Sequence, residues 1–199
     1  DGDRGAAMEV MGDGAAAIAT RFHEAGTLDG ILGLGGSGNT SIATRAMRAL
    51  PVGVPKLIVS TMASGDTEPY VGATDIAMLY SVADIEGLNQ LSRTVIANAA
   101  LAMVGMVAND PGVELSNKST IGITMFGVTT PCVQAAREVL EDRGYETIVF
   151  HATGTGGRAM ENLIREGVID GVLDVTTTEW ADELVGGVLS AGPDRLDAA

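Results

Sequence analysis

The sequence predicts an α/β fold in which mainly parallel sheets are covered by helices. Apolar segments rich in β-branched residues alternate with segments of helical character, and this alternation is typical of parallel sheets. Hydrophobic residues make up 46% of the chain and aromatic residues 4%, so the core is built from Ala, Val, Ile, Leu and Met. Loops rich in Gly, Ser and Thr follow the predicted strands. Such loops gather at one edge of a parallel sheet, where ligands of this fold class bind.

The first half of the chain begins with an alanine-rich segment that we expect to form a helix. It spans residues 4–25, and Gly12 and Gly14 weaken its helical propensity. The alternation continues with strands at 28–34, 56–62 and 75–82 and helices at 40–50 and 88–107. The strand at 56–62 has the sequence KLIVSTM, and its nearly continuous apolar character indicates burial on both faces.

A polar, turn-rich stretch at residues 108–119 separates the two halves of the chain, and we place a domain boundary between residues 112 and 113. Three consecutive strand–helix pairs follow this stretch. Their strands are expected at 120–126, 146–151 and 171–175, and their helices at 130–143, 157–166 and 179–189. The sequence therefore predicts one α/β unit over residues 1–112 and the start of a second over residues 113–199.

The run GLGGSGNT at residues 33–40 joins a predicted strand to a predicted helix. Glycine tolerates the positive φ of a tight turn, and a helix start offers unpaired N–H groups and a positive dipole end. Gly33, Gly35 and Gly38 also match the G-x-G-x-x-G pattern of dinucleotide sites. No Lys follows the glycines, which excludes a Walker A loop, and Asp66 comes too late to be the ribose-binding acid. The loop therefore indicates an anion site, but an incomplete NAD site.

The other β→α loops offer hydroxyl and N–H groups suited to a polyanion, and a nucleoside phosphate is the ligand we expect. Arg158 is either a bidentate phosphate ligand or a surface arginine paired with Glu161. Asp66, Asp75 and Asp84 are candidates to help hold Mg²⁺ or are caps and surface charges, and none is assigned as a metal ligand. The predicted nucleotide-binding residues are Gly35, Gly36, Ser37, Gly38, Asn39, Thr40, Ser64, Gly65, Asp66, Thr129, Thr130, Thr153, Gly154, Thr155, Gly156, Gly157 and Arg158.

The charge of the chain argues against several classes of partner. The formal net charge is −14 and no cluster of Lys or Arg is present, so we expect neither nucleic acid nor an anionic membrane as a partner. No uninterrupted run of 18 apolar residues predicts a membrane-spanning helix, and no signal peptide opens the chain. Cys132 is the only cysteine, which excludes an intrachain disulfide and fits a cytoplasmic protein.

Two residues are candidates for acid–base catalysis. His151 ends a predicted strand ahead of a glycine loop, a suitable place for a general base. Glu179 and Asp182 lie three positions apart on one helix face, either as a carboxylate pair for proton transfer or as solvated charges that complement the helix dipole. No C-x-x-C, H-E-x-x-H or G-x-S-x-G motif is present. The sequence therefore leaves open whether the protein is an enzyme.

Long ordered blocks of the chain resemble one protein family. The blocks are GILGLGGSGNTSIATRAMRALPVGVPKLIVSTMASGD, YVGATDIAMLYSVADIEGLN, FGVTTPCVQAAREVLEDRGYETIVFHATGTGGRAMENLI, GVLDVTTTEWADELVGG and SAGPDR. They are similar to the ATP-binding domain family typified by the tomato mosaic virus resistance protein, long filed as an uncharacterised protein family. The similarity covers nearly the whole chain, and its blocks are far more specific than a single glycine motif.

The resemblance implies two Rossmann-like subdomains, ATP binding and a homodimer. Asn39 stands where the family often has Gly, and Asn tolerates the left-handed conformation better than most residues. The family also has a β-α unit before residue 1 and more of the second subdomain after residue 199. We therefore expect the chain to be incomplete at both ends, either as a fragment or completed by partner segments.

Together these observations predict an ATP-binding protein whose phosphates are held by the β→α loops between two subdomains. Two alternatives remain. One is an enzyme acting on a small phosphorylated or carboxylated metabolite, with His151 or Glu179 as the acid–base residue. The other is a protein-interaction scaffold in which the nucleotide is structural. No settled reaction comes with the family resemblance.

Overall fold

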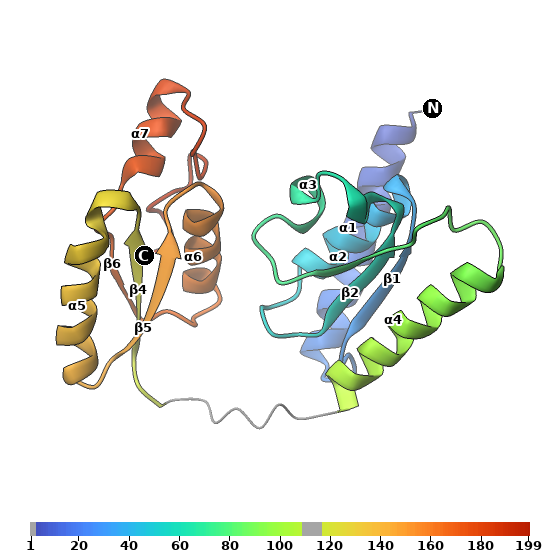
Figure 1. Ribbon diagram of the computed structural model, residues 1–199, viewed down its shortest axis with the longest axis horizontal. Helices are drawn as coiled ribbons and strands as arrows, with labels where there is room; N and C mark the ends of the chain where they lie inside the picture. The colour runs from blue at the N-terminus through green and yellow to red at the C-terminus, as the bar shows by residue number, and fades with distance from the viewer. Residues whose placement is uncertain (1–2, 109–116) are drawn as a thin grey trace. The chain divides into compact units, whose positions relative to one another are not determined.

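The computed structural model describes residues 3–108 and 117–199 and divides the chain into two compact units (Figure 1). Unit 1 is Asp1–Val113 and unit 2 is Glu114–Ala199. Each unit contains a three-stranded parallel sheet with helices packed on it, which confirms the predicted α/β class and is consistent with two Rossmann-like subdomains. The boundary expected between residues 112 and 113 lies outside the described residues.

Unit 1 is arranged around its middle strand. In chain order its elements are α1 (Arg4–Glu24), β1 (Ile31–Gly35), α2 (Ser37–Arg48), β2 (Lys56–Ser60), a 3₁₀ turn (Thr61–Ser64), α3 (Glu68–Val71), β3 (Ala77–Tyr80) and α4 (Gln90–Ala108). The strand order is β1-β2-β3, and every residue of β2 is buried. The prediction of a strand covered on both faces is therefore confirmed.

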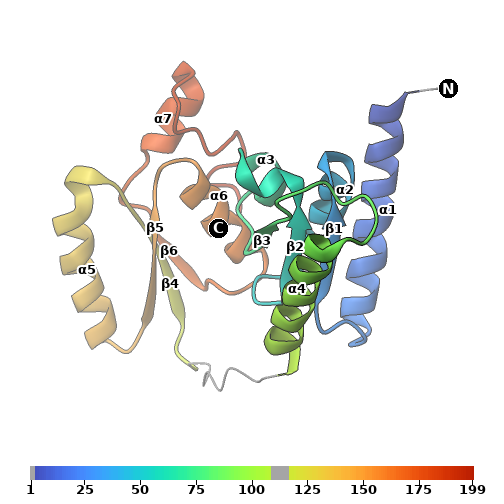
Figure 2. The same ribbon diagram turned by 45° about the vertical axis from the view of Figure 1, so that its right-hand side comes forward.

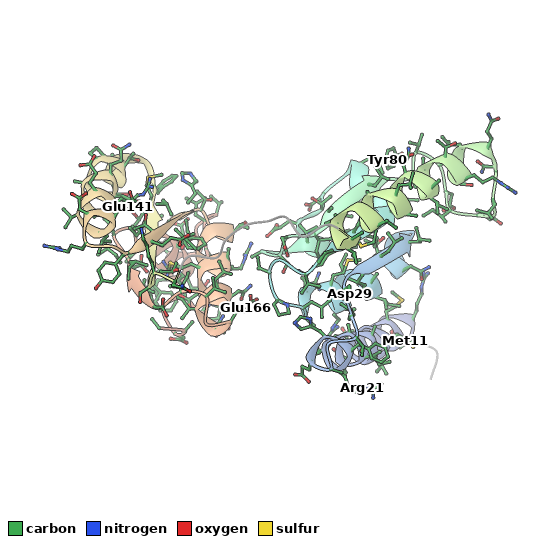
Figure 3. All side chains as sticks on the ribbon, turned by 90° about the horizontal axis from the view of Figure 1, so that it is seen from below. Met11, Arg21, Asp29, Tyr80, Glu141 and Glu166 are labelled. Atoms are coloured by element: carbon green, nitrogen blue, oxygen red, sulfur yellow. The ribbon has the colours of Figure 1, made fainter. Side chains whose placement is uncertain are left out.

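The core of unit 1 lies on both sides of that sheet. On one face α2 packs on the strands and α1 packs on α2, with Ala19 and Ala46 buried in this layer. On the other face Ala99 of α4 contacts Leu57 and Val59 of β2. Figure 3 shows these layers edge-on, with the labelled Met11 on α1 and α4 on the opposite side of the strands. Small residues in these layers let the helices pack closely.

Unit 2 repeats the strand–helix alternation. Its elements are β4 (Thr120–Met125), α5 (Thr130–Asp142), β5 (Glu146–His151), α6 (Thr155–Arg165), β6 (Gly171–Leu173) and α7 (Thr178–Val185), with a 3₁₀ turn at Gly127–Thr129. The strand order is β5-β4-β6. Helices α5 and α6 lie on opposite sides of the strands (Figures 1 and 2), and α6 buries Met160 against Phe150 and Ile169.

Two local features differ from the sequence prediction. No helix was predicted between the strands expected at 56–62 and 75–82, but Pro69 lies in the first turn of a short helix there, where its missing N–H leaves no hydrogen bond unmade. The helix expected at 179–189 ends at Val185, because Gly186 adopts a left-handed conformation with φ +74° that terminates helices. The first difference is a short helix that was not predicted, and the second is a helix end that a single glycine decides.

Helix α4 corrects the expectation that no segment is apolar enough to span a membrane. By length and composition alone α4 meets that criterion, and only 11% of its apolar stretch is buried. Arg93 and Asn98 interrupt the apolar residues of α4, so the helix contains no uninterrupted run of 18 apolar residues. A single such helix supports a membrane span only weakly, since sheet-covering helices share its composition. Here α4 packs on β2 through Ala99.

Candidate functional site

The carboxyl ends of the strands in unit 1 form a hydrogen-bonded row. Gly35, Ser60 and Tyr80 are register partners at the ends of β1, β2 and β3. The hydroxyl groups of Thr40 and Ser60 lie 2.6 Å apart, and both side chains are fully buried. The N–H of Ser81 donates to the carbonyl oxygen of Ser60 at 3.2 Å. The first turn of α2 is thereby connected across β2 to the segment that leaves β3.

The amino end of α2 carries no internal capping group. Gly36 is the N-cap residue and offers no side-chain oxygen, and the first turn contains no acidic residue. Among the residues that the structure describes, none accepts a hydrogen bond from the amides of Ser37, Gly38 or Asn39. These N–H groups and the positive end of the helix dipole are therefore free to bind an anion.

Gly35 and Gly36, the two glycines at this turn, differ in whether the fold requires a glycine at their position. A Cβ on Gly35 would overlap the side chain of Asn39, so packing excludes any side chain there. Gly36 has φ −81° and ψ −167°, which any L-residue adopts, and an added Cβ would meet Thr61 Oγ1 at 3.7 Å, an ordinary contact. Neither the backbone nor the packing requires glycine at position 36. The missing side chain therefore leaves open space at the N-cap position of α2.

Arg4 lies beside the same helix end, although the sequence did not single it out. Its Nη2 atom is 3.6 Å from the position that a Cβ on Gly38 would take. Within residues 3–108 and 117–199 no carboxylate forms an ion pair with Arg4. A cation next to a positive helix end is unfavourable unless an anion is bound between them. No sequence signal identifies Arg4, since its position depends on the packing of α1 against α2.

The loop after β2 lies at the same sheet edge, since β2 neighbours β1 in a parallel sheet. Ser60 Oγ accepts a hydrogen bond from the N–H of Met62, and Asp66 accepts one from the N–H of Glu68. The predicted residues Ser64 and Gly65 belong to this loop. The structure therefore brings the predicted segments 35–40 and 64–66 to one edge of unit 1.

Asp75 lies at the opposite edge of this sheet and cannot join Asp66 at a magnesium site. It precedes β3, and its Oδ1 atom lies 2.7 Å from the Nζ atom of the fully buried Lys56. The carbonyl oxygens of Pro51 and Val54 also accept hydrogen bonds from Lys56. The role of Asp75 is therefore to neutralise a buried lysine. In the part of the chain that the structure describes, no cluster of three His, Cys, Asp or Glu residues suits a metal ion.

In unit 2 the predicted anion groups of the β5→α6 loop bind a carboxylate of the chain itself. The N–H groups of Gly154 and Gly157 donate to Glu179 Oε1 at 2.7 and 2.9 Å. Glu179 is fully buried, and its Oε2 atom lies 2.9 Å from Nε of Arg195. Glu179 thus occupies the position at the start of α6 where the sequence predicted a phosphate, and it is inaccessible for acid–base catalysis.

Arg195 is the central residue of a buried ionic cluster that sequence reasoning missed. Its side chain is 2% exposed and contacts Glu161 at 3.2 Å, Asp174 at 2.7 Å and Glu179. The Asp174 contact is an ion pair without hydrogen-bond alignment. Burial acts to lower the pKa of Arg195, but the hydrogen bond to Glu179 and the charge of Asp174 raise it overall. The guanidinium therefore stays charged and binds the C-terminal segment to the rest of unit 2.

Thr129 and Thr130 also have partners within unit 2. The hydroxyl groups of Thr129 and Thr176 lie 2.7 Å apart, and Thr130 donates to the carbonyl oxygen of Gly127 at 2.8 Å. The N–H of Thr176 donates in turn to Thr124 Oγ1. These bonds join the loops after β4 and β6, so the polar groups at this edge bind mainly one another.

His151 lies at the carboxyl end of β5, as predicted. Its ring packs edge to face against Phe126, with ring centroids 5.3 Å apart and an interplanar angle of 67°. The imidazole is exposed, and among the described residues it has no hydrogen-bonded hydroxyl, thiol or carboxylate partner. The geometry of His151 is that of a packed surface aromatic residue rather than of a general base next to a nucleophile.

Comparison with protein-family models identifies both units. The N-terminal domain of the uncharacterised protein family UPF0261 matches residues 1–112, and the C-terminal domain of the same family matches residues 118–199. The chain belongs to the UPF0261 family. The resemblance noted in the sequence is therefore confirmed at the level of the family, whose description names no ligand and no reaction.

Individual UPF0261 relatives come from bacteria and plants. A UPF0261 protein of Clostridium tetani is 62% identical over 197 residues, which are 99% of this chain and 49% of that protein. The UPF0261 protein RA0729 of Rhizobium meliloti is 53% identical over 98% of this chain and 48% of its own length. The ToMV resistance protein Tm-1(GCR237) of Solanum lycopersicum is 50% identical over 98% of this chain and 26% of its own length. The chain thus spans half or less of these relatives.

Proposed function

We propose that the protein binds ATP, or a closely related nucleotide, with its phosphates at the amino end of α2. The observation that carries this proposal is the uncapped first turn of α2 behind Gly36, a glycine that the fold does not require. Arg4, which forms no ion pair with a described carboxylate, adds a positive charge at the same place. Backbone N–H groups at a helix start and an arginine are the groups that bind phosphate oxygens in proteins.

The contacts proposed for this nucleotide fall into two groups. Residues 35–40 and 64–66 lie at the open edge of unit 1 and are the phosphate contacts we favour. Thr129, Thr130 and residues 153–158 in unit 2 are weaker candidates, because the amides of Gly154 and Gly157 can bind a phosphate only if Glu179 leaves. Mg²⁺ would be bound mainly by the phosphates, as is usual for nucleotide sites.

Of the two alternative functions, a scaffold with a structural nucleotide is more compatible with this geometry than an enzyme. Both acid–base candidates lack a catalytic setting, since Glu179 is buried in an ionic cluster and His151 packs on Phe126. The free thiol of Cys132 is exposed, which suits the reducing cytoplasm that we propose as the location of the protein. We therefore propose nucleotide binding without assigning a reaction.

Gly36→Val is expected to abolish most of the ATP-induced rise in Tm. The added side chain projects into the space before the α2 amides, while the extended backbone at position 36 accepts valine. At an ATP concentration about 100 times Kd, the wild-type chain gains about 2.7 kcal/mol of stability from the ligand. Without ATP the variant loses only about 1 kcal/mol, the cost of a poor N-cap residue. Thermal unfolding with and without ATP measures both effects.

The control for this experiment is Gly14→Val, at an exposed helical glycine with no atom within 4 Å of an added Cβ. It is expected to keep the full ATP effect. Arg4→Met should weaken ATP binding several-fold while leaving the unliganded Tm almost unchanged, because Arg4 is exposed. An equal ATP shift in wild type, Gly36→Val and Gly14→Val contradicts the proposed site, and no shift with any nucleotide contradicts the proposed function.

We also propose that the protein forms a homodimer through α4. Leu101 and Val104 on this helix are 69% and 60% exposed, and Arg93 is the only charged residue in it. Two copies that each carry a net charge of −14 repel one another least where the surface is uncharged. Helix α4 is therefore the surface of unit 1 on which a second copy can bury apolar area at small electrostatic cost.

Leu101→Glu is expected to weaken self-association by at least about tenfold, since it buries an unpaired carboxylate in each copy. Sedimentation equilibrium at several protein concentrations gives the dimer dissociation constant. Leu184→Glu is the matched control, because Leu184 is 74% exposed on α7 in unit 2. Equal dissociation constants for the two variants would rule out α4 as the contact surface.

A further inference from the structure

Val82 has a backbone conformation that valine rarely adopts. Its φ is +66°, in the left-handed region, where a β-branched side chain crowds its own backbone. Val82 is 57% exposed, so burial in the protein does not compensate for this conformation. Residues in such conformations occur preferentially at ligand-binding sites, where the surrounding structure holds them in place. The position of Val82 just after β3 indicates which kind of ligand this is.

Two hydrogen bonds of Ser81 hold Val82 at the exit of β3. The N–H of Ser81 donates to the carbonyl oxygen of Ser60 at 3.2 Å, and its hydroxyl group donates to the carbonyl oxygen of Ala83 at 2.7 Å. The hydroxyl group of Ser60 in turn lies 2.6 Å from that of Thr40, in the first turn of α2. The turn at Val82 is thus connected through Ser60 to the helix end that we propose binds phosphate.

The spacing between these two places suits an elongated ligand. Neighbouring strands lie about 4.8 Å apart, so the exits of β1 and β3 are separated by about 10 Å along the sheet edge. One end of this row offers N–H groups and Arg4 to an anion, and the other end offers an exposed apolar side chain. A nucleoside phosphate has this distribution of chemistry, with an anionic end and a flat, largely apolar ring at the other.

We propose that Val82 is the apolar contact for the base of the bound nucleotide, so that it contributes to specificity for a nucleotide over a simple polyphosphate. This inference rests on the proposed function, because it requires phosphates at α2. The proposed function concerns the phosphates of the nucleotide, whereas this inference concerns its base. Inorganic tripolyphosphate has phosphates but no base, so its binding tests the phosphate site alone.

The test uses the full 199-residue chain in calorimetric titrations with ATP and with inorganic tripolyphosphate. Val82→Gly and Val82→Asn both accept positive φ and remove the apolar side chain. Each is expected to weaken ATP binding about tenfold, the value of one buried aliphatic side chain. Tripolyphosphate affinity and Tm should not fall. Val188→Gly is the matched control, since Val188 is 95% exposed in unit 2, and should change neither affinity.

Three results would overturn this inference. One is an unchanged ATP affinity in both Val82 variants, which would make the side chain irrelevant to the ligand. Another is an equal loss for ATP and tripolyphosphate, which would place the effect on the phosphate end. The third is a wild-type chain that binds both ligands equally well, which leaves no base contact to assign. A wild-type chain that binds neither ligand instead refutes the proposed function, and this inference with it.

Discussion

Arg195→Met is expected to lower the free energy of unfolding of unit 2 by about 3–5 kcal/mol. The substitution keeps an apolar side chain of similar length but removes the guanidinium that contacts Glu161, Asp174 and Glu179. Glu161 and Glu179 are buried, and each would lose its buried cation. Removing one partner of a buried ion pair is costly because the remaining charge is poorly solvated.

The fluorescence of Trp180 measures this effect during urea unfolding, since Trp180 is the only tryptophan and lies in α7 next to Glu179. Arg165→Met is the matched control. Arg165 is 47% exposed and lies 3.7 Å from Glu161, so its loss should cost less than about 1 kcal/mol. Similar unfolding midpoints for the two variants would show that the cluster does not stabilise unit 2.

The stabilisation by Arg195 should not depend on pH across the neutral and moderately alkaline range. The pKa of Arg195 is raised in the folded state, by the hydrogen bond to Glu179 and the charge of Asp174 acting against burial. A group with a raised pKa contributes its full stability below its unfolded value and loses it as the pH rises through the folded value. For an arginine both values lie far above neutral pH.

Gly156→Ala is expected to destabilise unit 2 by about 3 kcal/mol, the upper range for an overpacked site. A Cβ at this position would overlap the backbone carbonyl of His151 at the end of β5. Backbone atoms cannot rotate away as a side chain can, so α6 or the end of β5 must move. Urea unfolding followed by Trp180 fluorescence again gives the change, and the packing of His151 on Phe126 should be disturbed as well.

Gly14→Ala provides the contrasting control in another helix. No atom lies within 4 Å of a Cβ added to Gly14 in α1, so alanine there should stabilise unit 1 by about 0.5–1 kcal/mol through its higher helix propensity. Thermal unfolding followed by circular dichroism measures this gain. If Gly156→Ala were as well tolerated as Gly14→Ala, that result would contradict the close contact between α6 and the end of β5.

Much of the fold could be predicted because it depends on local patterns. The strand at 146–151 was predicted with its observed bounds, and β2 was predicted from the run KLIVSTM at 56–62, of which residues 56–60 form the strand. The strand–turn–helix order around Gly35 was also predicted correctly, although α2 begins at Ser37 rather than at residue 40. Helix starts are harder to predict, since one cap residue decides them. The short helix α3 was missed for that reason.

The candidate site was less predictable, because its decisive contacts join residues far apart in the chain. Gly154 and Glu179 are 25 positions apart, and Arg195 and Glu161 are 34 apart. The sequence pattern marked Gly154 as an anion-binding residue, and an anion is indeed bound there, but it is the carboxylate of Glu179. Arg4 and Val82 carry no motif, and their importance appears only from their neighbours and backbone conformation.

The α/β class and the loops whose glycines and hydroxyl groups suit an anion could be inferred from the sequence alone. These properties follow from periodicity and composition within a few neighbouring residues, which hydrophobic burial and backbone sterics translate directly into structure. Which of those loops remains open depends on contacts between residues far apart in the chain. At the start of α6 the N–H groups of Gly154 and Gly157 donate to the carboxylate of Glu179, whereas no side chain of the described residues caps the start of α2.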